Sequence, residues 1–234
     1  MEEFTTSFGR SAAEALPVER AQFIRKTYAL LAAAILAFVG LEFAIFASGF
    51  ADDIAATMLG TQYSWLIVLG AFMGISYLAN WWANSQSSSA MQYAGLALYV
   101  AAEAVIFVPL IFIAAVYSDA TVIPKAGIVT LGLFLGITAT VFLTKTDFSF
   151  LRPILMIGGF AALGFIVASI MFGFSLGSVF AFVMVAFAGT AILYNTSNVL
   201  HQFNTTQHVA ASLTLFASIA LLFWYILSIF SSRD

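Results

Sequence analysis

Two acidic side chains, Glu42 and Glu103, lie well inside long apolar stretches of the sequence. Charged groups are costly inside a membrane, so acids at such positions commonly mark ion pathways or proton relays. Glu103 precedes Pro109 by six residues, and a proline inside a helix leaves one backbone carbonyl without its donor. A carboxyl group and a freed carbonyl at this depth would bind a cation or carry a proton. The alternative for both glutamates is a neutral acid, hydrogen-bonded to a neighbouring helix.

A second group of polar residues follows the sixth apolar stretch. Asn195, Asn198 and Gln202 are spaced i, i+3 and i+7, so they would share one face of a helix. His201 and His208 are seven residues apart, which is not the i, i+4 spacing of a metal-binding helix. We therefore predict a polar helix face here and no metal site.

The sequence carries no signature of catalysis. It contains no cysteine and only two histidines, and it lacks the nucleophile, zinc-protease and phosphate-loop motifs. No aspartate lies within an apolar stretch, as an intramembrane aspartyl protease would require. We predict that the protein is not an enzyme and binds no cofactor.

The elements that position these residues are membrane spans. Of the 234 residues, 62% are hydrophobic and 8% are charged, whereas soluble domains have about 25% charged residues. This composition excludes a soluble enzyme, a nucleic-acid-binding protein and a disordered chain. The net charge of −3 is too small to indicate a charged partner, and the remaining class is an all-α polytopic membrane protein.

Seven apolar stretches are long enough to span a bilayer. We expect them at residues 28–50, 64–82, 91–117, 126–144, 153–174, 176–194 and 209–230. The domain organisation is then an N-terminal cytoplasmic tail, 1–27, and a single seven-helix membrane domain, 28–231. The tail is polar and does not resemble a signal peptide, and on its composition it is unstructured or loosely helical, with Pro17 interrupting it.

The positive-inside rule orients these spans. With the N-terminus in the cytoplasm, the cytoplasmic segments carry Arg10, Arg20, Arg25, Lys26, Lys145 and Arg152, and the other side carries Lys125 and Arg233. We therefore expect a cytoplasmic N-terminus and a C-terminus on the opposite side. The alternative is that the short GFSLG segment at 173–177 is re-entrant, which would leave six spans and move the C-terminus inside.

Two GxxxG pairs, Gly70–Gly74 and Gly132–Gly136, lie within the second and fourth stretches. Small residues at this spacing let helices approach closely. We expect them to pack inside the bundle, and the alternative is a face for dimerisation.

Four segments resemble those of a known family. They are the R-x-T-Y sequence at 25–28, TKTDFSFL at 144–151, ILYNTSNVLH at 192–201 and the terminal SSRD at 231–234. Together they resemble the Bax inhibitor family, and specifically its bacterial YccA-like branch. The resemblance covers nearly the whole chain, and the second and third motifs are its most specific parts.

The resemblance implies a fold in which six helices surround a central seventh. It marks Asp147, Asn198 and His201 as the polar residues of the family motifs. Members of this family are associated with two activities: modulation of the membrane-anchored AAA protease FtsH, and a pH-sensitive calcium leak governed by two aspartates in the sixth and seventh spans. At those two positions this chain has Asn195 and Ser218. Neither side chain ionises, although the two can hydrogen-bond to each other.

Two hypotheses follow from this departure. The first is a multi-pass protein of the bacterial inner membrane that modulates membrane proteostasis with an FtsH-type protease. Its partners would be the lipid bilayer and that protease, with no nucleic acid. The alternative is a pH-sensitive leak channel for calcium or another cation that uses Glu103 and Glu42 in place of the missing aspartates.

Overall fold

The protein is a bundle of helices. The computed structural model describes residues 11–61, 63–85 and 88–232. Within these ranges the helices are α1 (Pro17–Ala47), α2 (Ala51–Leu59), α3 (Ser64–Ala83), α4 (Ser89–Tyr117), α5 (Val122–Thr144), α6 (Leu151–Phe172), α7 (Gly177–His201) and α8 (His208–Ser231). All but α2 are long and apolar enough to cross a membrane. The predicted all-α fold with seven spans is therefore confirmed.

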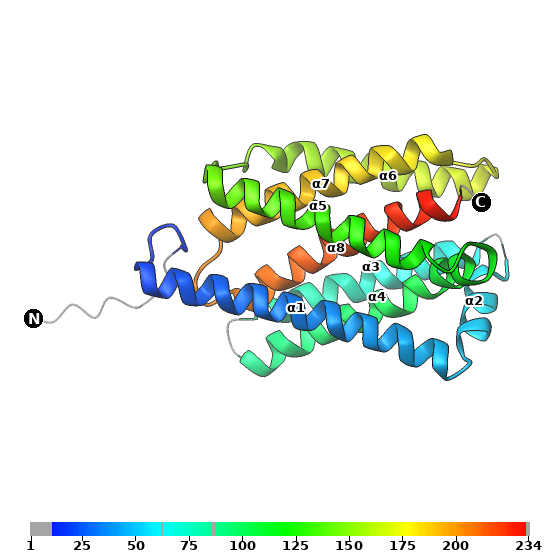
Figure 1. The fold of residues 1–234 in the computed structure, drawn as a ribbon, viewed down its shortest axis with the longest axis horizontal. Coiled ribbons are helices and arrows are strands. Elements are labelled where there is room, and N and C mark those ends of the chain that lie inside the picture. The colour runs from blue at the N-terminus through cyan, green and yellow to red at the C-terminus, as the bar shows by residue number, and fades with distance from the viewer. Residues whose placement is uncertain (1–10, 62, 86–87, 233–234) are drawn as a thin grey trace, which may run out of the picture.

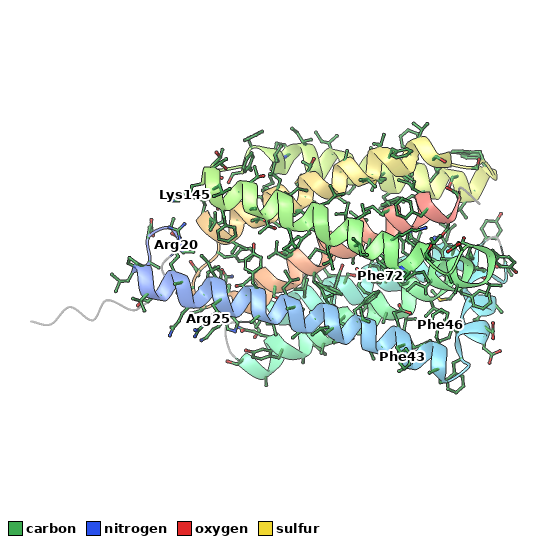
Figure 2. The ribbon with its side chains drawn as sticks, viewed as in Figure 1. Arg20, Arg25, Phe43, Phe46, Phe72 and Lys145 are labelled. Carbon is green, nitrogen blue, oxygen red and sulfur yellow. The ribbon has the colours of Figure 1, made fainter. Side chains whose placement is uncertain are left out.

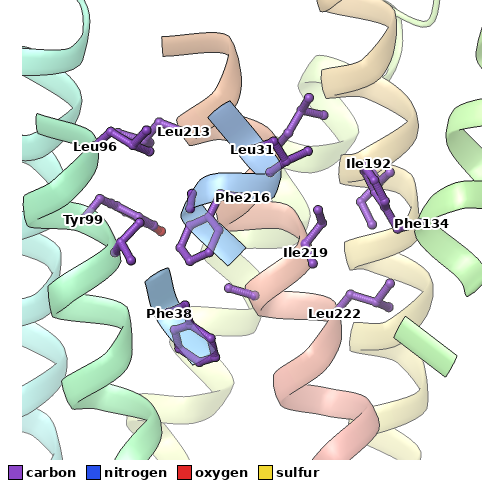
Figure 3. Close-up of a cluster of buried hydrophobic side chains, with 14 of the residues drawn as sticks. Leu31, Phe38, Leu96, Tyr99, Phe134, Ile192, Leu213, Phe216, Ile219 and Leu222 are labelled. Carbon is purple, nitrogen blue, oxygen red and sulfur yellow. The ribbon is translucent and has the colours of Figure 1, made fainter. Parts of the chain in front are cut away.

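The last helix, α8, lies at the centre of the bundle (Figure 1). Most of its residues are buried, and it packs against α1, α3, α4, α5 and α7, whereas α6 packs chiefly on α7. Figure 3 shows side chains from four other helices around α8, namely Leu31, Phe38, Leu96, Tyr99, Phe134 and Ile192 around Leu213, Phe216, Ile219 and Leu222. Lipid tails are as apolar as these side chains, so close van der Waals packing holds the helices together.

The first helix begins earlier than the hydropathy pattern predicts. Helix α1 starts at Pro17, and the expectation that this proline interrupts the tail is wrong. Proline is favoured at the first helical position because its missing N–H has no partner there and its fixed φ suits a helix. Just before the helix, the buried Ala12 donates its N–H to the carbonyl of Phe203 at 2.8 Å. Ser11 and Asn204 form an antiparallel bridge beside it.

Two further segments that lie outside the predicted apolar stretches are helical. Helix α2 buries Ala51, Ala55 and Met58 along one face, and its first turn carries Asp52 and Asp53, which are favourable at a helix N-terminus. Helix α7 continues beyond residue 194 to His201, and its polar last turns are buried. A search for long apolar stretches does not detect short helical segments that have one apolar face and one polar face.

The two GxxxG pairs do not pack inside the bundle. A Cβ atom added at Gly70, Gly74, Gly132 or Gly136 would have nothing within 4 Å. The expectation of internal packing is therefore wrong at both pairs. The close contact in this region is instead made at Gly95, where an added Cβ would lie 2.6 Å from backbone atoms of α3.

The two ends of the bundle differ in charge. Figure 2 shows Arg20, Arg25 and Lys145 at the end where α1 begins, whereas Phe43 and Phe46 lie toward the other end. The chain enters the bundle at the basic end, and α8 finishes at the opposite end (Figure 1). The terminal residues of the SSRD motif, Arg233 and Asp234, lie outside the described residues.

Candidate functional site

A cavity of about 800 Å³ lies within the membrane-spanning bundle. Its walls come from α3, α4, α6, α7 and α8. It brings together residues far apart in the sequence, including Glu103, Asn195 and Ser218. A volume of roughly 300–1,000 Å³ is typical of sites for small organic ligands.

Glu103 supplies the carboxyl group of this cavity. It lies on α4 with an exposed fraction of 6%, and its carboxyl interacts with the hydroxyl of Tyr99 one turn earlier. Tyr99, Glu103, Ile106 and Phe107 all line the cavity, because residues three and four apart share one helix face.

Asn195 and Ser218 form a hydrogen-bonded pair between α7 and α8. The Asn195 Nδ2 atom donates to Ser218 Oγ at 2.8 Å and lies 3.4 Å from the carbonyl oxygen of Thr214. Ser218 Oγ in turn donates to that same carbonyl at 3.0 Å. The sequence prediction that these two side chains can hydrogen-bond is confirmed by this geometry. The pair is neutral, so it holds the two helices together without a charge.

Aromatic rings make up much of the cavity wall. Trp65 of α3 stacks on Trp224 of α8 with ring centroids 5.9 Å apart, and Phe107 meets Trp224 edge-on at 5.0 Å. Phe180 and Tyr225 form another edge-on pair, at 6.0 Å. The cluster was missed because four helices contribute its rings, and no local spacing in the sequence links them.

The cavity is open on one side. Its lining residues on α4 are all buried, whereas those on α3 and α6 are half-buried. Along α8, the residues 214, 217, 221, 224 and 228 are also half-buried, although most residues of this helix are buried. Among the described residues α3 and α6 make no extensive contact, so the accessible side of the cavity lies between these two helices.

Glu42 and Pro109 do not line this cavity. Glu42 is 7% exposed, and neither of its carboxyl oxygens has a hydrogen-bond partner among the described residues. Pro109 is buried within α4, but the carbonyl it frees belongs to Val105, which is 48% exposed. Two residues along a helix turn by roughly 200°, so the side chains of Val105 and Glu103 lie on opposite sides of α4.

A second polar site lies at the basic end of the bundle, on the loop between α5 and α6. The backbone N–H of Phe148 donates to Ser197 Oγ at 2.9 Å, and the Gln202 side chain donates to Ser149 Oγ at 3.0 Å. His201 Nδ1 donates to the carbonyl of Ser197 at 3.0 Å. The first two bonds fasten the 145–150 loop to the end of α7, and the third lies within that helix.

Asp147 organises that loop from within. Its carboxylate accepts from the Ser149 hydroxyl at 2.5 Å and from the Ser149 N–H at 2.9 Å. These two hydrogen bonds hold the pKa of Asp147 below its ordinary value. Asn198 contributes through its backbone carbonyl, which accepts from the N–H groups of Gln202 and Phe203 at 2.8 and 2.9 Å and so ends the helix.

Comparison with known proteins identifies the family. The family described as "Inhibitor of apoptosis-promoting Bax1" matches residues 20–234. The chain belongs to the Bax inhibitor family. It is 29% identical over 219 residues to Bax inhibitor 1 of Schizosaccharomyces pombe, which covers 90% of this chain and 76% of that protein. It is 34% identical over 113 residues to the uncharacterized protein PA2604 of Pseudomonas aeruginosa, covering 47% of this chain and 50% of that protein.

Three of the four Bax inhibitor family motifs meet in space in this chain. Thr27 and Tyr28 of the R-x-T-Y sequence lie on α1, where Thr27 is fully buried and the Tyr28 ring packs edge-on against Phe142 of α5 at 5.8 Å. The Tyr28 hydroxyl lies near Thr138 of α5 and Thr196 of α7, but it makes no hydrogen bond of ordinary geometry with any described residue. Together with the bonds between Ser197 and the 145–150 loop, these contacts make three of the four motifs of this Bax inhibitor family chain one packed region at the basic end.

Proposed function

We propose that this protein is a YccA-like bacterial inner-membrane protein that modulates membrane proteostasis through an FtsH-type AAA protease. The neutral Asn195–Ser218 pair, bonded at 2.8 Å, carries the proposal. Two acids held close together sense pH because they cannot both ionise easily. An amide and a hydroxyl keep the helix contact but cannot titrate, which favours an interaction role over a pH-gated leak.

The arrangement of the N-terminal segment supports the same role. Ala12 bonds to the loop between α7 and α8, so the chain enters the bundle beside that loop at the basic end. The positive-inside rule assigns this end to the cytoplasm. The N-terminal tail would then be offered on the side where the AAA domain of a membrane-anchored protease works.

Co-purification and turnover test this proposal. The full chain, tagged at its C-terminus, is expected to retain FtsH from detergent-solubilised bacterial membranes and to lengthen the half-life of an FtsH substrate when overproduced.

Deletion of residues 1–10 keeps the Ala12 contact, and it is expected to slow the protein's own turnover by the protease without loss of membrane insertion. Glu103→Gln serves as a matched control, because Glu103 lies inside the bundle. Absence of FtsH from the eluate together with unchanged half-lives would refute the proposal.

A second candidate function is a calcium or other cation leak. The observation that favours it is that Glu103 lines the same cavity as Asn195 and Ser218. Asn195 and Ser218 stand where other members of the family have aspartates. The nearby Glu103 carboxyl could take the place of those aspartates in a cation pathway, and Glu42 would be a further acid outside the cavity.

Flux into proteoliposomes separates the two functions. Calcium entry would be measured at about pH 6 and about pH 8 for the unmodified chain, Glu103→Gln, Glu42→Gln and empty vesicles. The double variant Asn195→Asp/Ser218→Asp restores an acidic pair and serves as the positive control. Under the interaction proposal only this double variant conducts. Flux through the unmodified chain that Glu103→Gln abolishes would favour the leak.

A further inference from the structure

The cavity wall carries the features that attract a positive charge. Seven of its lining residues are aromatic: Trp65, Phe72, Tyr99, Phe107, Phe180, Trp224 and Tyr225. The faces of aromatic rings are negative and attract organic cations, and desolvation strengthens this attraction. The cavity thus has an apolar surface that favours cations over anions.

The charged group of the wall has the matching sign. Glu103 is an acid that is 6% exposed, and no lysine or arginine is found among the described residues that line the cavity. A cation in this space would find a carboxyl partner, whereas an anion would find no charge to compensate its desolvation.

The hydroxyl groups of the wall add hydrogen-bond acceptors. Each serine or threonine hydroxyl donates its proton to a carbonyl of its own helix: Ser169 to Ile166 at 2.8 Å, Thr214 to Ala211 at 3.0 Å, Ser218 to Thr214 at 3.0 Å and Ser228 to Trp224 at 2.8 Å. Because the hydroxyl protons are already donated, these side chains can interact with a ligand only through their oxygen lone pairs, as hydrogen-bond acceptors. This arrangement again favours a positively charged ligand.

The shape and access of the cavity indicate an organic ligand and not a bare metal ion. The volume of about 800 Å³ and the largely apolar lining suit a ligand of many carbon atoms. Small inorganic cations prefer sites built from several oxygen ligands, and no group of three or more acidic or histidine residues that could hold a metal occurs among the described residues. The open side between α3 and α6 faces the bilayer, where amphiphiles concentrate.

We propose that this cavity binds a lipophilic organic cation, of the quaternary ammonium or phosphonium class, which enters from the bilayer between α3 and α6. The Glu103 carboxyl neutralises the charge, and the rings of Trp65 and Trp224 contact the apolar body. This inference stands independently of the protease-modulating role, since it depends only on the cavity.

Equilibrium dialysis of the full chain in lipid nanodiscs tests the proposal. The probe is tetraphenylphosphonium, and the comparison is tetraphenylborate, which has nearly the same shape and the opposite charge. We expect saturable binding of the phosphonium at one site per chain, with quenching of tryptophan emission, and no saturable binding of the borate. Equal binding of the two ions would overturn the proposal.

Three variants locate the site. Glu103→Gln is expected to weaken phosphonium binding by about tenfold or more, because it removes the charge partner of a desolvated cation. Asn195→Asp adds an acid to the same wall and is expected to tighten binding several-fold. Asp52→Asn neutralises an exposed acid on α2, outside the cavity, and is expected to change nothing.

The outcome stays decisive if one variant does not fold. Folding is checked by a single symmetric peak in size-exclusion chromatography. Unchanged binding in folded Glu103→Gln overturns the proposal. If that variant aggregates, Asn195→Asp decides the matter, and unaltered phosphonium affinity in it overturns the proposal equally.

Discussion

The Asn195–Ser218 pair still joins α7 to α8 by a hydrogen bond, although neither side chain can ionise. The amide bridges α7 to α8 at 2.8 Å, and the serine hydroxyl proton goes to the carbonyl of Thr214. Removing the amide therefore leaves no buried donor without a partner. Interhelical hydrogen bonds in membrane proteins contribute about 0.6 kcal/mol on average, because the separated helices also find partners.

Asn195→Ala is accordingly expected to be mildly destabilising. A loss of about 0.6–1 kcal/mol would lower the melting temperature by about 1–4 °C in a chain of this size. The control is Thr190→Ala, since the exposed Thr190 hydroxyl bonds only to the carbonyl of Ala186 on its own helix. Thermal unfolding in detergent measures both. Equal melting temperatures for Asn195→Ala and the unmodified chain would contradict the assigned role of the bond.

Asp147 gives the 145–150 loop a dependence on pH. Hydrogen bonds from Ser149 hold the pKa of this carboxyl below its ordinary value, so the ionised form is favoured more in the folded protein than in the unfolded chain. The stabilisation is complete above the ordinary aspartate pKa of about 3.9 and disappears as the pH falls through the lowered value.

The corresponding prediction concerns the difference between two proteins. The unmodified chain is expected to melt at a higher temperature than Asp147→Asn at about pH 6, and the gap is expected to close toward about pH 3. The effect is small because the carboxylate is solvent-exposed. Glu14→Gln, at an exposed acid before α1, controls for the general loss of negative charge. A gap that widens on acidification would show that the assigned hydrogen bonds do not stabilise the fold.

At the scale of elements, hydropathy located the helices but not their contacts. Each of the seven spans contains one of the predicted apolar stretches for most of its length, since only a helix satisfies its backbone within a bilayer. The short amphipathic α2 was missed because tertiary packing, not length, makes it helical. The polar last turns of α7 were predicted only from the spacing of their polar residues, since they lie outside the apolar stretch. The GxxxG spacing led to a wrong prediction of internal packing, because the spacing alone does not determine which side of a helix faces the bundle.

The pairing of α3 with α4 depends on Gly95. An added Cβ would lie 2.6 Å from the Ala79 carbonyl oxygen and 2.6 Å from the Ala83 nitrogen, and neither backbone atom can move without shifting α3. Gly95→Ala is therefore expected to cost at least about 1–3 kcal/mol and to lower the yield of monodisperse protein. Fluorescence-detected size exclusion and thermal unfolding would measure these effects.

Gly132→Ala is the matched control for this prediction. The same added methyl group has nothing within 4 Å at Gly132, and alanine is a better helix former than glycine by about 0.5–1 kcal/mol. We expect this variant to melt at the same temperature as the unmodified chain or slightly higher. Similar melting temperatures for the two variants would mean that α3 and α4 do not approach as closely as described.

At the scale of the whole molecule, the site exists only after folding. Glu103 was identified from the sequence because an acid in an apolar stretch is conspicuous. The resemblance to the Bax inhibitor family pointed to Asn195 and Ser218. The cavity that joins the three, and its aromatic wall, depends on how four helices meet around one side of α8. The sequence offers no signal for this because each helix contributes residues whose spacing is also that of ordinary packing.

Orientation in the membrane is a further property of the whole molecule. Basic residues collect at the end where α1 begins, as Figure 2 shows for Arg20, Arg25 and Lys145, whereas Lys125 lies near the start of α5 at the other end. Lysine and arginine next to short loops are retained in the cytoplasm. We therefore expect the 145–150 loop in the cytoplasm and the loop between α4 and α5 on the opposite side.

The absence of cysteine from the sequence allows a direct test. Single cysteines would replace Lys145 and Asp119, both of which are exposed residues of loops at opposite ends of the bundle. A membrane-impermeant maleimide added to spheroplasts is expected to label Asp119→Cys at once and Lys145→Cys only after permeabilisation. The reverse pattern would place the basic end outside and remove the N-terminal tail from the reach of a cytoplasmic AAA domain, so it would also refute the proposed interaction with the protease.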